Sequence, residues 1–88
     1  MEQNFYNVIV SQRAKKDLLK INQLYVGSIV KALKGLEYNP RPFGSIKLAG
    51  SKSSYRIRVG VYRIIYTIED NILTVNVVKI DHRRNVYQ

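Results

Sequence analysis

Two different spacings of hydrophobic residues divide this 88-residue chain. Across residues 14–25 the apolar positions recur every three or four residues, which predicts an amphipathic helix with a basic outer face. After a break around residues 22–27 the same spacing returns over residues 26–36, and the asparagine and prolines of residues 39–42 end it. The first half of the chain therefore predicts two helices packed as a hairpin.

Strands are predicted on both sides of this hairpin. Residues 5–10 (FYNVIV) are rich in β-branched and aromatic side chains and precede Ser11, a favourable helix-capping residue. From Ile46 onward apolar and polar residues alternate between turn-forming segments. The predicted fold class is α+β: an N-terminal strand, a helical hairpin, and an antiparallel β-meander with both helices on one face of the sheet. We expect residues 1–88 to form a single domain, because a chain of this length supports one hydrophobic core.

The segment YRIRVGVYRIIYTI, residues 55–68, predicts a tight β-hairpin. Glycine suits the first central position of a type II′ turn, so Gly60 and Val61 would fix the register of the flanking strands. The pairs expected on an apolar face are Val59 with Tyr62, Ile57 with Ile64, and Tyr55 with Tyr66. The pairs expected on the other face are Arg58 with Arg63 and Arg56 with Ile65.

A second two-residue turn, at Asp70 and Asn71, predicts the register of the last strand. The apolar face would continue through Ile68 with Leu73, Tyr66 with Val75, and Ile64 with Val77. The face that carries the arginines would continue through Thr67 with Thr74, Ile65 with Asn76, and Arg63 with Val78. We expect this strand to end near Ile80, and the tail after it to turn back across the arginines.

The three arginines of the hairpin predict an anion-binding site. Like charges directly opposite each other in a sheet are destabilising, and the predicted pairing places no acidic residue beside Arg56, Arg58 and Arg63. The planar guanidinium group presents paired donors that match a phosphate. The alternative is a set of solvated arginines on an exposed sheet face. Lys47 is either a further cation of this site or an ordinary surface lysine.

The composition narrows the partners and the chemistry. With 15 Lys and Arg against 6 Asp and Glu, the formal charge is +9, which attracts nucleic acid, although a basic surface that serves solubility is the alternative. The absence of cysteine excludes disulfide frameworks and cysteine-ligated zinc modules. No apolar run could cross a bilayer and no secretory signal is recognisable, so we expect a cytoplasmic protein without a membrane partner. No phosphate loop or metal-ligand cluster is recognisable, so catalysis is expected to need no metal and no cofactor.

Five fragments carry a family resemblance: AKKDLLKI at residues 14–21, LEYNP at 36–40, KLAG at 47–50, YRIRVGVYRIIYTIED at 55–70 and HRRNVY at 82–87. In this order and spacing they resemble the RelE/ParE toxin superfamily of prokaryotic toxin–antitoxin systems. The resemblance covers nearly the whole chain. Resemblance to the RelE branch implies a type II toxin that is a ribosome-dependent endoribonuclease, cleaving mRNA and inhibiting translation. It also implies the ribosome, mRNA and a cognate RelB-like antitoxin as partners, the last in a hetero-oligomer.

The same resemblance matches Arg56, Arg58, Arg63, Arg83 and Tyr87 to residues that act on RNA, whereas Lys47, His82 and Arg84 are added because we expect them to lie near these residues. The residues expected to be catalytic are Arg58, Arg63, Arg83 and Tyr87, and those expected to bind RNA are Lys47, Arg56, His82 and Arg84. The shortened tail leaves open whether Arg83 or Arg84 is the active-site arginine. In attack of a ribose 2′-hydroxyl on the adjacent phosphate, arginines would stabilise the phosphorane. Tyr87 is the candidate base, although a tyrosine with a pKa of about 10 is a weak base unless neighbouring arginines favour its ionised form.

Two other functions share this pattern. A ParE-like protein that poisons DNA gyrase without nuclease activity would have the same fold. A simple RNA-binding module would need only the basic surface, and its affinity would fall steeply with salt.

Overall fold

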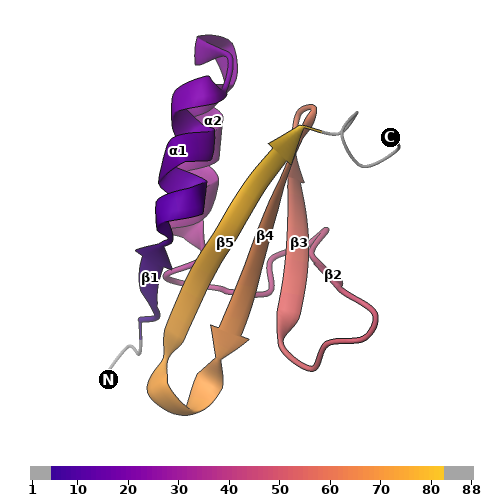
Figure 1. Ribbon diagram of the computed structural model, residues 1–88. Coiled ribbons are helices and arrows are strands. Elements are labelled where there is room, and N and C mark those ends of the chain that lie inside the picture. The colour runs from indigo at the N-terminus through magenta and orange to yellow at the C-terminus, as the bar shows by residue number, and fades with distance from the viewer. Residues whose placement is uncertain (1–4, 83–88) are drawn as a thin grey trace.

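The computed structural model describes residues 5–82 of the chain (Figure 1). Its elements are β1 (Asn7–Val10), α1 (Gln12–Lys20), α2 (Gln23–Gly35), β2 (Ile46–Lys47), β3 (Ser54–Val59), β4 (Tyr62–Glu69), the 3-10 turn η1 (Asp70–Ile72) and β5 (Thr74–His82). The described strands form a five-stranded sheet in the order β1-β5-β4-β3-β2. The predicted α+β fold is confirmed. β1 runs parallel to β5 while the other neighbours are antiparallel, so the sheet is mixed.

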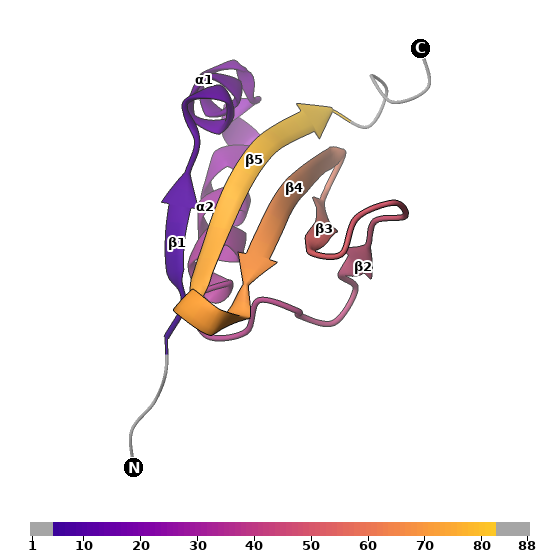
Figure 2. The same ribbon diagram turned by 60° about the horizontal axis from the view of Figure 1, so that its bottom comes forward.

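Both helices lie on the same face of this sheet, as Figures 1 and 2 show from two directions. Their inward residues pack against alternate residues of the long strands, as expected for a sheet with one covered face. The core consists of Ala14, Ile21, Ile29, Leu33 and Leu36 from the helical region and Ile57, Tyr62, Ile64, Tyr66, Ile68, Val75, Val77 and Ile80 from the strands. The other face of the sheet carries no helix among the described residues.

The break between the helices lies at Asn22. α1 begins after Ser11, whose Oγ accepts a hydrogen bond from the N–H of Ala14 at 3.0 Å, as a capping serine should. The prediction that the first helix continues to residue 25 is wrong, because Asn22 caps α2 by accepting a hydrogen bond from the N–H of Leu24 at 3.0 Å. Tyr25 consequently belongs to α2, where it faces the sheet.

The β3–β4 hairpin has the predicted register. Gly60 has a φ of 60°, which suits the first central position of a type II′ turn. The Tyr25 ring lies against this turn: a Cβ at Gly60 would clash with Cε1 of Tyr25 and lie 2.8 Å from its Cδ1. The same ring makes an edge contact with the ring of Tyr62, with 5.4 Å between the centroids. The helical hairpin therefore holds the turn from the covered side of the sheet.

The register predicted for β5 is wrong. Residues 70–73, not a two-residue turn, connect β4 to β5, because η1 is followed by Leu73 in a left-handed conformation with a φ of 48°. A β-bulge at Val78 then inserts one extra residue into β5 opposite the Ile65–Tyr66 step. The observed pairs are Ile68 with Val75, Tyr66 with Val77, Ile65 with Lys79, Ile64 with Ile80, Arg63 with Asp81 and Tyr62 with His82. The bulge reverses the alternation, so that Asp81 rather than Val78 lies opposite Arg63.

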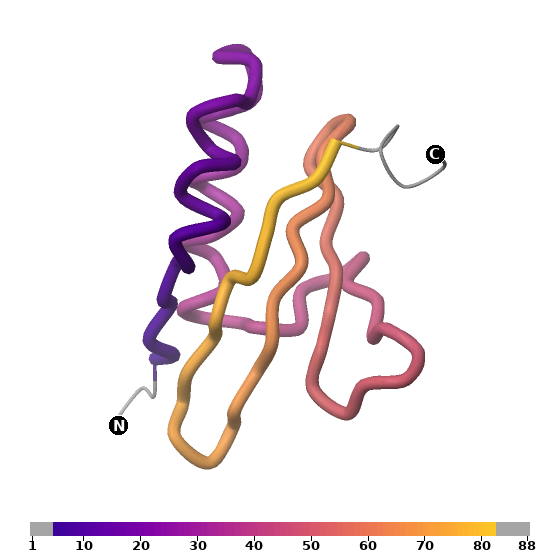
Figure 3. The backbone as a smooth tube through the Cα atoms, in the orientation of Figure 1, coloured from indigo at the N-terminus to yellow at the C-terminus, as the bar shows by residue number. Residues whose placement is uncertain are grey.

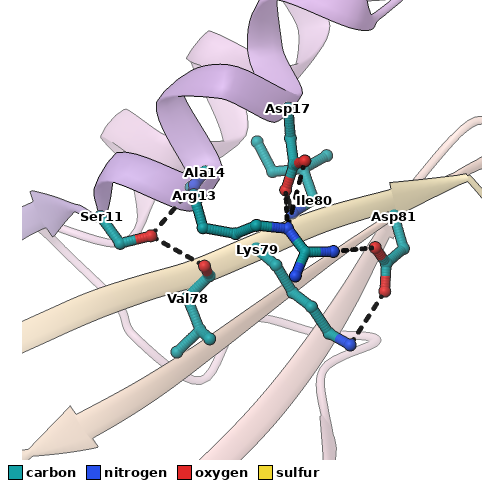
Figure 4. Close-up of polar contacts among 8 residues, drawn as sticks. All are labelled: Ser11, Arg13, Ala14, Asp17, Val78, Lys79, Ile80 and Asp81. Atoms are coloured by element: carbon teal, nitrogen blue, oxygen red, sulfur yellow. Dashed lines mark hydrogen bonds and ion pairs between the residues drawn. The ribbon is translucent and has the colours of Figure 1, made fainter.

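Two side chains, that of the residue that caps α1 and one from within α1, bind the backbone of β5 at and after this bulge (Figure 4). The Ser11 hydroxyl donates to the carbonyl of Val78 at 2.8 Å, and Oδ2 of Asp17 accepts from the N–H of Ile80 at 3.0 Å. β1 pairs only with the first four residues of β5, so this part of β5 is an edge whose backbone groups need other partners. α1 supplies them and thereby stabilises the bulged conformation.

A polar cluster holds the loop after α2, which crosses from the helices to the far edge of the sheet (Figure 3). Arg41 donates to both carboxylate oxygens of Asp70, at 2.8 and 3.2 Å, and to the hydroxyl of Tyr55 at 3.1 Å. The hydroxyl of Tyr6 donates to Oδ1 of Asp70 at 2.6 Å. The bonds from Arg41 and then Tyr6 lower the pKa of Asp70 to about 2. We call these four residues the Arg41 clasp.

We expect Gly60→Ala to destabilise the protein more than Gly50→Ala. Both glycines have positive φ, 60° and 80°, but a Cβ at Gly50 would meet nothing within 4 Å. Left-handed backbone costs a residue with a Cβ about 1–2 kcal/mol, and overpacking against Tyr25 would add about 1–3 kcal/mol at Gly60 alone. Urea unfolding of the two variants measures the difference. Equal losses of unfolding free energy would contradict the packing of Tyr25 on this turn.

We expect Asp70→Asn to flatten the acid dependence of stability. The folded protein holds the pKa of Asp70 at about 2, below the ordinary value of 3.8, so on acidification the unfolded chain takes up this proton first. The stabilisation from Asp70 is therefore complete above pH ~4 and is lost as the pH falls toward ~2. Urea midpoints across this range should fall less in Asp70→Asn than in the wild type. Glu69→Gln, which removes the adjacent exposed carboxylate, is the control, and identical profiles for wild type and Asp70→Asn would refute the role of the clasp.

Candidate nucleic-acid interface

Three arginines lie together on the face of the sheet that the helices leave uncovered. Arg58 is the direct cross-strand partner of Arg63, and Arg56 is two residues along β3 on the same face. Lys79 joins them from β5 through its pairing with Ile65. We call the surface formed by Arg56, Arg58, Arg63 and Lys79 the arginine face. The predicted gathering of the three arginines is thus confirmed.

Exposure differs sharply across the arginine face. Arg63 on the central strand β4 is only 7% exposed, whereas Arg58 on β3 is exposed and Arg56 is intermediate. A guanidinium group stays charged at any ordinary pH, and its field is stronger where water is excluded. The arrangement therefore combines a fixed, desolvated charge at Arg63 with a reachable one at Arg58. Such a pair can bind an anion that approaches from the solvent.

An acidic residue lies at the β5 side of this face, contrary to the prediction. The bulge at Val78 places Asp81 opposite Arg63. Asp81 forms ion pairs with Lys79 at 3.2 Å and with Arg13 of α1 at 3.6 Å (Figure 4). Two cations thus share the charge of Asp81, and the face keeps an excess of positive charge. No local signal in the sequence marks this position, because it depends on contacts between β5 and α1.

Two of the residues predicted to bind RNA do not join the arginine face. Lys47 pairs with Tyr55, whose side chain packs toward the helices, so the register places Lys47 on the covered side of the sheet. His82 pairs with Tyr62 and its ring makes an edge contact with the Tyr62 ring, with 5.3 Å between the centroids. The expected strand end at Ile80 is also wrong, since β5 continues to His82. Arg83, Arg84 and Tyr87 lie outside the described residues.

A cavity of about 390 Å³ opens beside Arg58 and Arg56. Its remaining lining comes from Phe43, Gly44, Ile46 and Ile57. Phe43, in the loop between α2 and β2, is fully exposed, and Ile46 is about half exposed. The sequence pattern did not single out Phe43. The available signal was a lone aromatic residue between Pro42 and Gly44, in a segment without helical or strand periodicity.

A second cavity, of about 300 Å³, lies at the other side of the sheet, between α1 and the end of β5. Arg13, Asp17, Lys20 and Asp81 contribute both signs of charge to its lining, together with His82. Within residues 5–82 there is no group of three or more His, Cys, Asp or Glu that could hold a metal ion. In the same part of the chain, no helix combines the length and the apolar character that crossing a membrane requires.

Comparison with known proteins agrees with this architecture. Toxin RelG of Mycobacterium tuberculosis is 29% identical over 84 residues, which cover 94% of this chain and 97% of that protein. Among solved structures, RelE in the archaeal RelE–RelB complex from Pyrococcus horikoshii superimposes with a TM-score of 0.81 at 28% identity, covering 90% of this chain and 96% of that one. The isolated RelE toxin of E. coli gives a TM-score of 0.76 at 27% identity, covering 93% of this chain and 90% of that one.

A family model described as the ParE toxin of the type II toxin–antitoxin system parDE matches residues 8–87. This match includes both helices, the HRRNVY segment and every described strand except the first residue of β1. Together with the relatives above, it shows that the chain belongs to the ParE toxin family and is the toxin of a type II toxin–antitoxin system.

Proposed function

We propose that this toxin is an endoribonuclease that cleaves mRNA on the ribosome in the cytoplasm and so inhibits translation. The observation that carries the proposal is the direct pairing of Arg58 with Arg63, beside Arg56, on the uncovered face of the sheet. Two opposed guanidinium groups concentrate positive charge on this face, and the phosphates of RNA are anions that paired guanidinium donors fit well. The similarity to proteins named RelE, together with the RNA target that resemblance to the RelE branch implies, favours RNA over other polyanions.

The proposed reaction is an internal transfer at one phosphate of the mRNA. The ribose 2′-oxygen loses its proton and forms a bond to the adjacent phosphorus, and the bond from phosphorus to the 5′-oxygen of the next nucleotide breaks in line with it. The products are a 2′,3′-cyclic phosphate and a 5′-hydroxyl. No water, metal or cofactor enters this balance. The protein must remove one proton, stabilise the negative charge that grows on the phosphoryl oxygens, and supply one proton to the leaving oxygen.

Residues of this chain can be assigned to the first two of these tasks. Arg58 and Arg63 stabilise the phosphorane, since fixed cations are most effective where charge develops in the transition state. Tyr87 removes the 2′-hydroxyl proton, and Arg83 or Arg84 binds the same phosphate; both assignments rest on the family resemblance of the HRRNVY segment. Arg56 and the other tail arginine bind the flanking RNA backbone. Lys47 and His82 receive no role at the scissile phosphate, because they lie on the other side of the sheet.

The ribosome fits this proposal because the site is poor in proton-transfer groups. Arginine is a weak acid, and an unperturbed tyrosine is a weak base at neutral pH. Holding the 2′-oxygen in line with the scissile bond can supply about 7–11 kcal/mol of the barrier. A toxin with fixed cations but weak acids and bases therefore depends on an external scaffold to orient its substrate, and the ribosome provides one for mRNA.

A second candidate function has its own support. The matching family model carries the name of the ParE toxin. Resemblance to the ParE branch implies a poison of DNA gyrase without nuclease activity. On this alternative the arginine face would bind protein or DNA rather than a scissile RNA phosphate. The two functions differ in which cellular process stops first.

The antitoxin is the third part of the proposal. We expect a RelB-like partner with an acidic or amphipathic segment that is disordered alone and folds against the toxin, covering its basic surface. The formal charge of +9 and the excess of positive charge on the arginine face favour such a partner, as do the complexes that relatives form with RelB. The product of the adjacent gene should co-purify with the toxin as a hetero-oligomer, and its affinity should fall as salt rises. Failure to co-purify at low salt would contradict this part.

We expect Arg58→Gln to reduce mRNA cleavage on translating ribosomes by about 10²–10³-fold, the usual effect of losing one preorganised charge donor. Arg58 is exposed, so this variant should keep the wild-type fold. Lys31→Gln removes the same charge from an exposed position on α2 and is the matched control. Tyr87→Phe and Arg63→Gln should also lose activity.

In cells, wild-type toxin should stop methionine incorporation before thymidine incorporation, and the reverse order would reject the nuclease in favour of the gyrase poison.

A further inference from the structure

We propose that the cavity beside Arg58 binds one unpaired RNA base, with the ring of Phe43 as its stacking platform. The inference rests on the proposed ribonuclease function and adds a specificity site to it. The base would belong to a nucleotide next to the phosphate held by the arginine face. Phe43 would thus select or orient the substrate without touching the reacting atoms.

A tight turn holds Phe43 in the solvent. The N–H of Ser45 donates to the carbonyl of Pro42 at 2.9 Å, and Gly44 has a φ of 92°. This is the pattern of a type II turn, in which glycine takes the third position and the second side chain projects from the corner. Phe43 occupies that second position. Its exposure is therefore built into the backbone rather than being the result of a loose side chain.

The loop is anchored in the three residues before Pro42. The buried hydroxyl of Tyr66 donates to the carbonyl of Pro40 at 2.8 Å. The Arg41 clasp fixes the next residue through Asp70 and Tyr55, and the N–H of Arg41 also donates to Oδ1 of Asn39 at 3.1 Å. A large apolar ring that stays in water contributes little to the stability of the fold, because it buries no apolar surface. Binding by such a prepositioned group is favourable because little conformational freedom is lost.

The walls of the cavity match the two halves of a nucleotide. Phe43 and Ile46 form an apolar side, and the side chains of Arg56 and Arg58 form a cationic side. Aromatic rings stack on unpaired bases of any sequence, and arginine binds the backbone phosphate or stacks on the base from its other side. The volume of about 390 Å³ lies at the small end of the range for ligand sites, which runs from about 300 to 1,000 Å³. One nucleotide, rather than a large ligand, suits this size.

The cavity lies close to Arg63, so a base bound in it would belong to a nucleotide next to the scissile phosphate. Arg58 lines the cavity and is also the direct cross-strand partner of Arg63. A phosphate bound between these two arginines therefore lies at the mouth of the cavity. The attached nucleotide can place its base against Phe43 while its phosphate stays on the arginine face. An apolar side chain of a protein partner would fill the apolar side but would bring no negative charge to the exposed Arg58, whereas a nucleotide brings both a base and a phosphate, so RNA is favoured.

The test compares Phe43→Ala with Phe43→Trp in binding to a short fluorescein-labelled single-stranded RNA. Phe43→Ala should weaken binding about tenfold, the effect expected for loss of one base-stacking contact, and Phe43→Trp should retain wild-type affinity. The slope of affinity against salt should stay unchanged in Phe43→Ala, since no phosphate contact is lost, but fall by about one in Arg58→Gln. Leu24→Ala, which removes another highly exposed apolar side chain from α2, is the control.

An RNA of the same length with abasic sites completes the experiment, because Phe43→Ala and wild type should bind it equally. If wild type and Phe43→Ala bind the intact RNA equally, the base site is refuted, while the ribonuclease proposal stands on the separate ribosome assay. If Phe43→Ala weakens capture of the antitoxin but not of RNA, the cavity is a protein-docking site and the inference is overturned. If the wild type neither binds RNA nor cleaves mRNA on ribosomes, the proposed function fails and this inference fails with it.

Discussion

The pairing of β3 with β4 across Gly60 is the constraint on which the rest of the arrangement depends. Side chains alternate along a strand, so the register that buries Ile57 and Ile64 beneath the helices also places Arg58 opposite Arg63 on the other face. Burying an isoleucine contributes about 1.5–3 kcal/mol, whereas a cross-strand pair, favourable or repulsive, is worth about 0.2–1 kcal/mol. Core burial therefore outweighs the repulsion between the arginines. A slip by one residue would bring arginines into the core, so the charges cannot separate without loss of the fold.

The helical hairpin acts on both ends of the arginine face without contributing to its centre. Tyr25 of α2 packs on the Gly60 turn, which limits how the β3–β4 hairpin can twist. Ser11, which caps α1, and Asp17 within α1 bind the backbone of β5 at Val78 and Ile80, and the bulge brings Lys79 and Asp81 to the uncovered face. The helices therefore influence the electrostatics of a surface whose centre they do not touch. Substitutions on the covered side of the sheet can change the charge pattern on the other.

Local chemistry explains which parts of this structure the sequence could predict. The β3–β4 register follows from a single glycine whose positive φ the turn requires, so three arginines could be placed on one face before the structure was known. The β5 register could not be obtained in this way. Asp70 and Asn71 resemble a two-residue turn, but the connection depends on Leu73 in a left-handed conformation that its side chain does not favour. The bulge depends on Ser11 and Asp17, more than sixty residues away in the chain. Asp81 and His82 take their faces from this register, and Lys47 takes its face from its pairing with Tyr55. Phe43 was missed because an exposed loop residue leaves no periodic pattern.

The arginines and Phe43, the two parts of the candidate site, are held in place by different contacts. The arginines are fixed by the hydrophobic core through strand alternation, and Phe43 is fixed by the Arg41 clasp and the Pro40 carbonyl at the other end of the sheet. β3 joins them, because Tyr55 on its covered side binds Arg41 while Arg56 and Arg58 line the cavity from its uncovered side. A strand that carries a clasp residue on one face and cavity residues on the other keeps their spacing constant without a further contact. The backbone consequently sets the distance between the proposed base site at Phe43 and the proposed phosphate site at Arg58. Such a rigid spacing suits a protein that selects its substrate by fit to a preformed site and does not close around it.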